Sequence, residues 1–119
     1  MREIRSYKDL LVWQRSMDLV ETVYRLTKAF PVAEQFGLIS QMRRCAVSVP
    51  SNIAEGYGRQ ATGEYRHHLS LARGSLLELE TQVLLAERLK YAESGQIKLI
   101  LTEVDQISRM LASLVAKIV

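Results

Sequence analysis

Glu64 and His67 form the E-x-x-H pattern of di-iron carboxylate bundles, in which two such pairs and two further glutamates face one metal centre. The chain contains only two histidines, and they are adjacent, at positions 67 and 68. A second copy of the pattern is therefore excluded within one subunit. We expect Glu64 and His67 to be solvated residues in the first turn of a helix, and we expect no metal and no other cofactor.

Candidate nucleophiles are equally poorly supported. Cys45, the single cysteine, has no histidine near it in the sequence and neighbours Ala46 on an apolar stripe, which predicts a small buried thiol. Gly56–Ala61 fits the G-x-G-x-x-A pattern, but a dinucleotide site requires a preceding strand, and this segment follows a predicted helix. No recognisable base accompanies four of the serines on the predicted helices, Ser48, Ser51, Ser70 and Ser75. The sequence therefore predicts that the protein is not an enzyme.

A polar stripe on the second predicted helix is the most informative group of side chains. Its members recur at spacings of three and four residues and so share one helix face: Gln41, Arg44, Ser48, Asn52 and Glu55. Pro50 leaves one backbone carbonyl without its N–H partner, and a side-chain donor such as the Asn52 amide can satisfy it. The stripe predicts a hydrogen-bonded network that fixes a kink or an inter-subunit seam. A ligand-binding face and a solvated face are the alternatives.

Basic residues are expected to gather at one end of the molecule. The net charge is +3, and residues 1–59 carry all of the excess, with nine Lys and Arg against six Asp and Glu. In an antiparallel bundle the start of the third helix shares an end with the start of the first. Lys8, Arg59 and Arg66 then lie together, and Arg73 continues their stripe by one heptad. Because basic groups bind phosphates and Tyr7 can stack on a base, these four are candidates for nucleic-acid binding. An ordinary mixed-charge surface is the alternative.

Four segments with helical periodicity position these residues. Apolar residues recur in each at alternating spacings of three and four, as on one helix face. The repeats predict helices over residues 9–30, 34–55 and 62–90, and from about 97 to the C-terminus. In the first segment, the residues expected to face the core are Leu10, Trp13, Met17, Val20 and Tyr24.

The ends of these segments carry recognisable signals. Asp9 is the expected N-cap of the first helix, and Pro31 is expected to end it. Gly56 and Gly58 are expected to adopt the left-handed conformation that closes the second helix. The pair at 94–95, serine and glycine, is expected to form the turn before the last helix.

Helices joined by short connections must alternate in direction, because a short loop cannot return to the starting end. The sequence therefore predicts an all-α protein, an antiparallel up-down-up-down four-helix bundle kinked at Pro50, as a single domain over residues 1–119. The 7% aromatic content and two prolines argue against a β-sandwich. A charged N-terminal segment, a single cysteine and no long apolar stretch predict a bacterial-type cytoplasmic protein.

The helices carry more apolar residues than a bundle core requires, which is about three positions in seven. A second stripe on the first helix comprises Leu19, Val23, Leu26 and Phe30. Further apolar positions on the last two helices are Leu71, Leu77, Leu84, Leu85, Leu99, Leu101, Met110 and Val115. We expect some of these side chains to face another subunit. A wide core stripe within the monomer is the alternative.

These residues also carry a family resemblance. The run Gln41–Gly56, QMRRCAVSVPSNIAEG, resembles the signature of the four-helix-bundle proteins named for the intervening sequences of bacterial 23S ribosomal RNA genes. Tyr7–Trp13, YKDLLVW, and Ala72–Glu80, ARGSLLELE, resemble that family's opening and its third-helix motif. The resemblance covers nearly the whole chain and implies subunits that assemble into a barrel-like ring, commonly a pentamer. It also implies kinship with the accessory protein of diversity-generating retroelements, a basic bundle ring that is thought to bind RNA and a reverse transcriptase.

The sequence and the resemblance together predict a non-enzymatic homo-oligomer that binds RNA or another nucleic acid through a basic end or a central channel. The expected partners are further copies of the chain and RNA or a nucleic-acid-processing protein, and no membrane is expected. The alternative is a protein–protein interaction scaffold that binds no nucleic acid.

Overall fold

The computed structural model describes residues 3–118, which form four long helices and two single-turn 3₁₀ helices. In chain order they are η1 (Tyr7–Asp9), α1 (Leu11–Thr27), η2 (Val32–Glu34), α2 (Leu38–Tyr57), α3 (Thr62–Arg88) and α4 (Ser94–Lys117). This part of the chain contains no strand. The predicted all-α class with four helices is confirmed.

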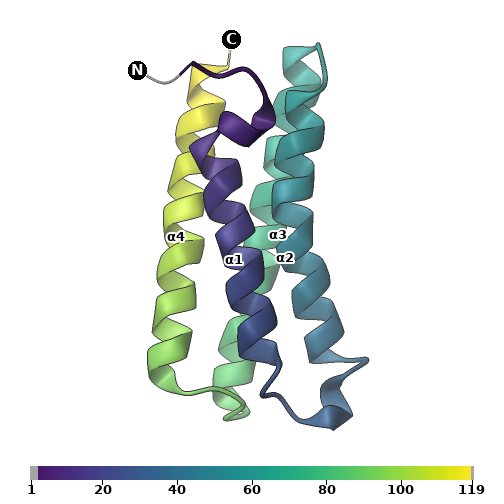
Figure 1. Cartoon of the computed structure of the whole chain (residues 1–119), viewed down its shortest axis with the longest axis vertical. Coiled ribbons are helices and arrows are strands. Elements are labelled where there is room, and N and C mark those ends of the chain that lie inside the picture. The colour runs from purple at the N-terminus through teal and green to yellow at the C-terminus, as the bar shows by residue number, and fades with distance from the viewer. Residues whose placement is uncertain (1–2, 119) are drawn as a thin grey trace.

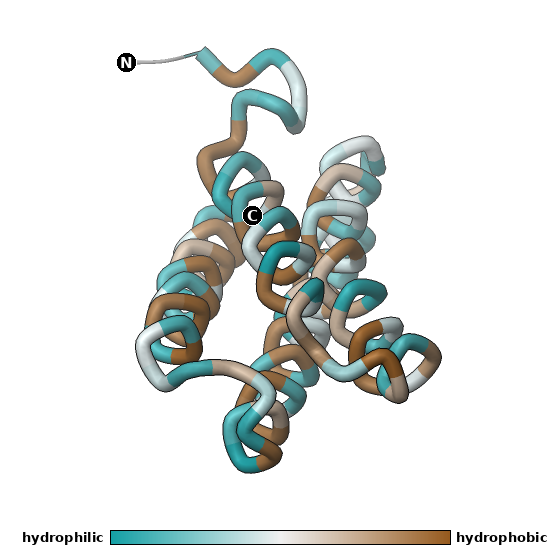
Figure 2. The backbone as a smooth tube through the Cα atoms, turned by 60° about the horizontal axis from the view of Figure 1, so that its bottom comes forward, coloured by the Kyte–Doolittle hydropathy of each residue, from teal (hydrophilic) through white to brown (hydrophobic). Residues whose placement is uncertain are grey.

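The four long helices lie side by side in a molecule of 44 × 27 × 19 Å (Figure 1). Each packs against two neighbours, so that α1 lies across the bundle from α3, and α2 from α4. The start of α1, the end of α4 and the α2–α3 connection lie at one end, and the other two connections lie at the opposite end (Figure 1). Hydrophobic and hydrophilic residues alternate in bands along every helix (Figure 2). Each helix therefore has an apolar face for the common core.

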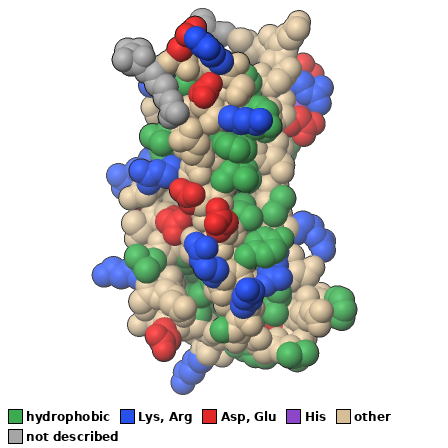
Figure 3. All heavy atoms as spheres, in the orientation of Figure 1, with side chains coloured by type: hydrophobic (Ala, Val, Ile, Leu, Met, Phe, Trp, Pro, Cys, Tyr) green, Lys and Arg blue, Asp and Glu red, His purple; other side chains and the backbone are tan. Residues whose placement is uncertain are grey.

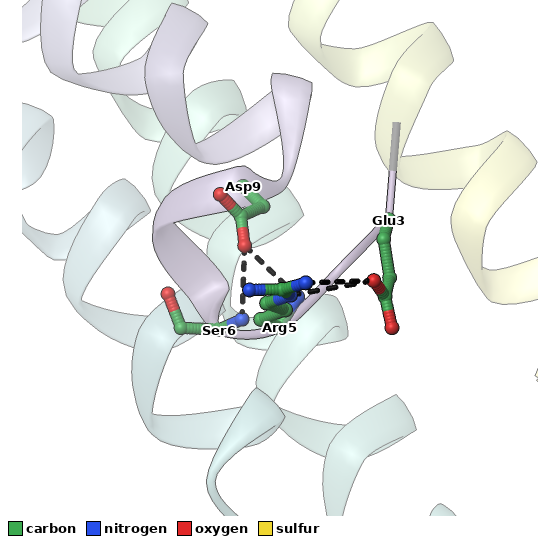
Figure 4. A network of polar contacts seen from close by, with 4 residues as sticks. All are labelled: Glu3, Arg5, Ser6 and Asp9. Carbon is green, nitrogen blue, oxygen red and sulfur yellow. Dashed lines mark hydrogen bonds and ion pairs between the residues drawn. The ribbon is translucent and has the colours of Figure 1, made fainter. Parts of the chain in front are cut away.

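The start of α1 differs from the sequence expectation, because Asp9 is not its N-cap. Leu10, in an extended conformation with ψ 123°, precedes the helix. Asp9 closes η1 instead, since its Oδ2 accepts hydrogen bonds from the backbone N–H groups of Arg5 at 2.9 Å and Ser6 at 3.2 Å (Figure 4). The Arg5 guanidinium in turn lies 3.2 Å from the Glu3 carboxylate. An aspartate binds the nearest free N–H groups, and here the 3₁₀ turn supplies them.

The core face of α1 was also predicted on the wrong stripe. Met17 and Tyr24, two of the expected core residues, are each 41% exposed. The other three, Leu10, Trp13 and Val20, are half-buried at the edge of the core. The core takes the stripe that was expected to be surplus, Leu19, Val23, Leu26 and Phe30.

Two buried hydroxyl groups lie on the core face of α1, so this face does not show a continuous apolar repeat in the sequence. The Ser16 hydroxyl donates to the carbonyl of Val12 at 2.7 Å, and the Thr27 hydroxyl donates to the carbonyl of Val23 at 2.8 Å. Because each hydroxyl finds its partner within its own helix, its burial costs little. Polar residues therefore interrupt the apolar repeat of this face without disturbing the core.

The second helix, α2, runs as one element through Pro50 to Tyr57. Of the apolar repeat predicted to face the core, four residues are buried, Met42, Ala46, Val49 and Ile53. The fifth, Ile39, is half-buried at the edge of the core. The prediction for its glycines is wrong, because no glycine of the described chain has a positive φ, and Gly58 has φ −72°. Gly56 is buried within α2, and a Cβ at this position would lie 2.7 Å from the Cβ of His68. Gly56 therefore permits the close approach of α2 to α3 rather than a turn.

The last two helices follow the sequence prediction closely. Most residues of their predicted core repeats are buried: Leu69, Ala72, Leu76, Leu79, Val83, Ala86, Ile97, Ile100, Val104, Ile107 and Leu111. The terminal members of these repeats, Tyr65, Leu114 and Ile118, are half-buried at the edge of the core. After α3, Lys90 adopts a left-handed conformation with φ 61°, and the N–H of Tyr91 reaches the carbonyl of Ala86 at 2.9 Å. This is the closing bond of a Schellman turn. Ser94 and Gly95, expected in the turn, lie instead in the first turn of α4.

Candidate functional site

A hydrogen-bonded network joins α2 to α3 through the polar stripe of α2. The hydroxyls of Ser48 and Ser75 lie 2.8 Å apart across the two helices. The Asn52 amide nitrogen donates to the carbonyl of Ser48 at 2.9 Å and to its hydroxyl at 3.0 Å, and the Asn52 carbonyl oxygen lies 3.2 Å from Nδ1 of His68. Ser48 and Asn52 of the predicted stripe therefore take part in one hydrogen-bonded network. The Asn52 amide, however, binds the carbonyl of Ser48, four residues before it, and not that of Ala46, which Pro50 leaves without its N–H.

The other members of the stripe are exposed along the outer side of α2. The Arg44 guanidinium donates to the Ser40 hydroxyl at 3.1 Å, and Glu55 accepts from Arg59 at the same distance. Gln41 and Arg44 line a shallow polar hollow of about 210 Å³ between α2 and α3, together with Ser48 and Glu78. The stripe therefore has two parts, a packed half that bridges two helices and an open half that faces solvent.

Cys45 lies at the bottom of the same hollow and is 7% exposed. Burial, and next the neighbouring carboxylate of Glu78, raise the pKa of the Cys45 thiol from its ordinary 9.0 to about 11. Gln82 and Arg44 act in the opposite direction but more weakly. Because the thiolate is the nucleophilic form, this thiol is unreactive at neutral pH.

The structure places Lys8, Arg59 and Arg66 near one end of the bundle, whereas Arg73 lies near the middle of α3. The Arg66 guanidinium donates to the backbone carbonyl of Ile118 at 2.6 Å, so the start of α3 meets the end of α4 as expected. Arg59 lies 3.1 Å from Glu55 and 3.9 Å from Glu64, which offset its charge. Lys8 and Arg73 are exposed.

The tyrosines at this end are already in contact with other aromatic rings. Tyr7 meets Trp13 edge-on at 5.3 Å between ring centroids, and Tyr57 meets Tyr65 in the same way at 6.1 Å. The Lys8 ammonium lies 6.0 Å from the Tyr7 ring. An edge-on contact leaves part of each ring accessible, but neither tyrosine projects alone from the surface.

The remaining sequence motifs assemble no reactive centre. Residues 3–118 contain no cluster of three His, Cys, Asp or Glu side chains that could hold a metal ion. His67 is exposed, and His68 belongs to the α2–α3 network. Within the same residues, no helix is long and apolar enough to cross a membrane.

An apolar groove between α1 and α2 is the feature that sequence reasoning missed. Its upper half is a hollow of about 340 Å³ that includes Trp13, Met17 and Val47 in its lining. Its lower half, of about 500 Å³, includes Val47 again with Tyr24 and the aromatic ring of Phe36. Hydrophobic side chains run along this side of the molecule in Figure 3, with basic side chains beside the lower part. The signal in the sequence was the three-four repeat of α1, of which Trp13, Met17, Val20 and Tyr24 line this groove.

Arginines border the lower half of this groove. The Arg43 guanidinium lies 4.5 Å from the centroid of the Tyr24 ring, in a cation–π contact, and its Nε donates to the Thr27 hydroxyl at 2.9 Å. Arg44 lines the same hollow and also the polar hollow on the other side of α2. The groove is thus apolar along its floor and basic along one rim.

Leucines of α3 and α4 are exposed, as the predicted surplus requires. Those of α3 are Leu71, Leu77, Leu84 and Leu85, and α4 adds Leu99, which is 68% exposed. The rest of the predicted surplus is not exposed, because Leu101, Met110 and Val115 are half-buried against the core and Leu19, Val23, Leu26 and Phe30 are buried. A single copy of the chain therefore leaves large apolar side chains uncovered on several sides.

The described chain is a four-helix bundle whose distinguishing features are a polar α2–α3 network and uncovered apolar surfaces. The model of the 23S rRNA-intervening sequence protein family matches residues 8–113, and the chain belongs to this family. It is similar to the crystal structure of a protein of unknown function from the S23 ribosomal protein family of Bacteroides thetaiotaomicron VPI-5482, with a TM-score of 0.80 and 21% identity. The match covers 88% of this chain and 98% of that one, and it shows the shared fold. No curated protein matches the chain.

Proposed function

We propose that this protein is a non-enzymatic, cytoplasmic homo-oligomer, a pentameric ring, that binds RNA or another nucleic acid through a basic end or a central channel. Its subunit is an antiparallel up-down-up-down bundle with α2 kinked at Pro50. The observation that carries the proposal is the amount of large apolar surface that one copy leaves uncovered, such as Leu77 at 63% and Phe36 at 91% exposure. Soluble monomers rarely expose extended apolar patches, which instead mark interaction sites.

Nucleic-acid binding is supported by charge and by family membership. The net charge is +3, and Lys8 and Arg73 are exposed. A ring repeats such a weak patch in every copy, so that several weak contacts act together on one polymer. The family is named for intervening sequences of 23S rRNA.

The test combines light scattering with RNA binding. We expect a mass several times the 13.6 kDa of one chain, and binding of a structured RNA whose log affinity falls with log salt by roughly 0.7 to 0.9 per phosphate contact. Substituting both Lys8 and Arg73 by glutamate should weaken binding, whereas substituting both Lys98 and Arg109 by glutamate, on the exposed side of α4, serves as the charge-matched control. A monomeric protein, or one that binds no RNA at low salt, would contradict the proposal.

A scaffold without nucleic acid is the second candidate, and a specific observation favours it. Arg59 and Arg66, half of the expected basic set, are held by Glu55, Glu64 and a backbone carbonyl. Their charge and donors are therefore less available to phosphates. If the purified oligomer shows a protein-like ratio of absorbance at 260 and 280 nm and retains one stoichiometric protein partner, the scaffold is favoured.

A further inference from the structure

The α1–α2 groove has the form of a site for a helix. It follows the bundle from Tyr7 at one end to Phe36 at the other, and its two hollows share Val47. Met17, Tyr24 and Val47 are each 40–41% exposed along it. An apolar groove of this length is covered well by the apolar edge of another helix, which offers residues at spacings of three, four and seven.

The chain itself provides a matching edge on α3. Leu71, Glu78 and Leu85 are spaced by seven and therefore lie on one line along the helix, about 21 Å from first to last. Glu78 lines the hollow between α2 and α3, which fixes this line on the side of α3 next to α2. The two leucines are 44% and 46% exposed. This line is called the leucine edge below.

Charge favours the pairing of these two surfaces. Arg43 and Arg44 line the lower half of the groove, and the leucine edge carries Glu78 midway between its two leucines. A basic rim and an edge that carries a carboxylate attract one another. Two basic grooves facing each other would repel, which disfavours a groove-to-groove dimer.

The size of the surfaces is adequate for a stable contact. Each side of the molecule measures 44 Å by at least 19 Å. The area of such a side is comparable to the roughly 800 Å² per partner that stable interfaces bury.

We infer that the α1–α2 groove of one copy binds the leucine edge of the next copy, head to tail. This inference rests on the proposed self-association and names the two surfaces that make it. Both surfaces border α2, with Val47 on one side of the helix and Ser48 on the other, so they occupy neighbouring sides of the bundle. A head-to-tail contact between neighbouring sides turns each copy strongly relative to the last and closes a small ring instead of extending a filament. The open half of the polar stripe, with Gln41 and Arg44, then faces the axis of the ring.

Three variants of equal charge change test the inference by light scattering. Met17→Glu changes the groove, Leu85→Glu changes the leucine edge, and Leu99→Glu, on α4, is the matched control at a more exposed leucine. We expect the first two to fall to the 13.6 kDa monomer and the third to keep the mass of the wild type. The helical signal in circular dichroism checks that each variant is folded. We expect all three to fold, because the substituted side chains are exposed.

Mixing the two monomeric variants is the decisive measurement. Met17→Glu keeps an intact leucine edge and Leu85→Glu keeps an intact groove, so a mixture should form a one-to-one dimer over a concentration series. Neither variant should dimerise alone. A mixture that stays monomeric, or a Leu99→Glu control that dissociates, would overturn the head-to-tail pairing. If the wild type assembles but both variants keep its full mass, only this inference fails, whereas a monomeric wild type would refute the proposed function itself.

Discussion

Replacing Gly56 by alanine tests the closest contact between α2 and α3. A Cβ added at this position would lie 2.7 Å from the Cβ of His68, 3.1 Å from Cδ1 of Tyr65 and 3.2 Å from the Tyr65 carbonyl oxygen. Two of these three atoms belong to the backbone of α3 or are attached directly to it. They cannot rotate away, so α2 and α3 must separate to admit the methyl group.

Two opposing effects determine how much Gly56→Ala changes the stability of the protein. Alanine is better than glycine within a helix by about 0.5–1 kcal/mol, which would stabilise the protein. Forcing an extra methyl group into a packed contact typically costs about 1–3 kcal/mol. Because the contact lies at 2.7 Å from a rigid atom, we expect the cost to win and Gly56→Ala to destabilise the protein by about 1–2 kcal/mol.

Gly74 provides the matched control. It lies within α3, and a Cβ there would have no atom of another side chain or segment within 4 Å. Gly74→Ala should therefore gain only the helix-propensity term and stabilise the protein by about 0.5–1 kcal/mol. The two substitutions, identical in chemistry, should shift stability in opposite directions.

Urea unfolding followed by far-ultraviolet circular dichroism measures both shifts. The denaturation midpoint should fall for Gly56→Ala and rise for Gly74→Ala, with little change in slope. All measurements need one protein concentration, because self-association adds a concentration-dependent term to stability. A Gly56→Ala protein as stable as the wild type, or stabilised like the control, would refute the argument that this glycine is needed for helix approach.

Three further predictions concern single positions. Lys90→Gly should stabilise the protein by about 0.5–1 kcal/mol, because a left-handed conformation suits glycine better; an unchanged melting temperature would contradict this. Asn52→Ala should cost about 1–3 kcal/mol in urea unfolding, since the Ser48 hydroxyl loses a half-buried partner; an unchanged midpoint would show that the network adds no stability. Because the Cys45 pKa is raised from 9.0 to about 11, its contribution to stability is complete below pH 9 and is lost as pH rises toward 11. At pH 8, iodoacetamide should alkylate the Cys45 thiol of the folded protein roughly 100-fold more slowly than that of the unfolded protein. Glu78→Gln should reduce this difference in rate. Equal alkylation rates in the folded and unfolded proteins would rule out the raised pKa.

Sequence reasoning succeeded where one apolar face dominates a helix. Leu79 on α3 and Ile107 on α4 lie on unbroken repeats, and both are buried as predicted. Burial of one stripe is the main gain in free energy available to such helices, so the repeat fixes which side turns inward. The polar stripe of α2 could also be recognised in the sequence, because the spacing of Ser48 and Asn52 places both side chains on one face of the helix.

Reasoning from the sequence failed where two faces of one helix compete or where a contact joins distant segments. On α1, the stripe with Met17 and the stripe with Leu19 are both apolar, and only the packing of neighbouring helices shows that the second is buried. Gly56 was assigned to a turn because a glycine after a helical repeat usually marks one. Its closeness to His68, twelve residues later, appears only when α2 and α3 are packed.

The order of the amino acids alone thus determined the helical class, the approximate bounds of four helices and the core of three of them. These properties follow from local hydrogen bonding and from the period of apolar residues along one segment. Tertiary structure decided which face of α1 is buried, that Arg66 is engaged by the carbonyl of Ile118, and that a groove runs between α1 and α2. Each of these depends on groups that are distant in the chain and meet only after the helices have packed, so no local pattern of residues can contain them.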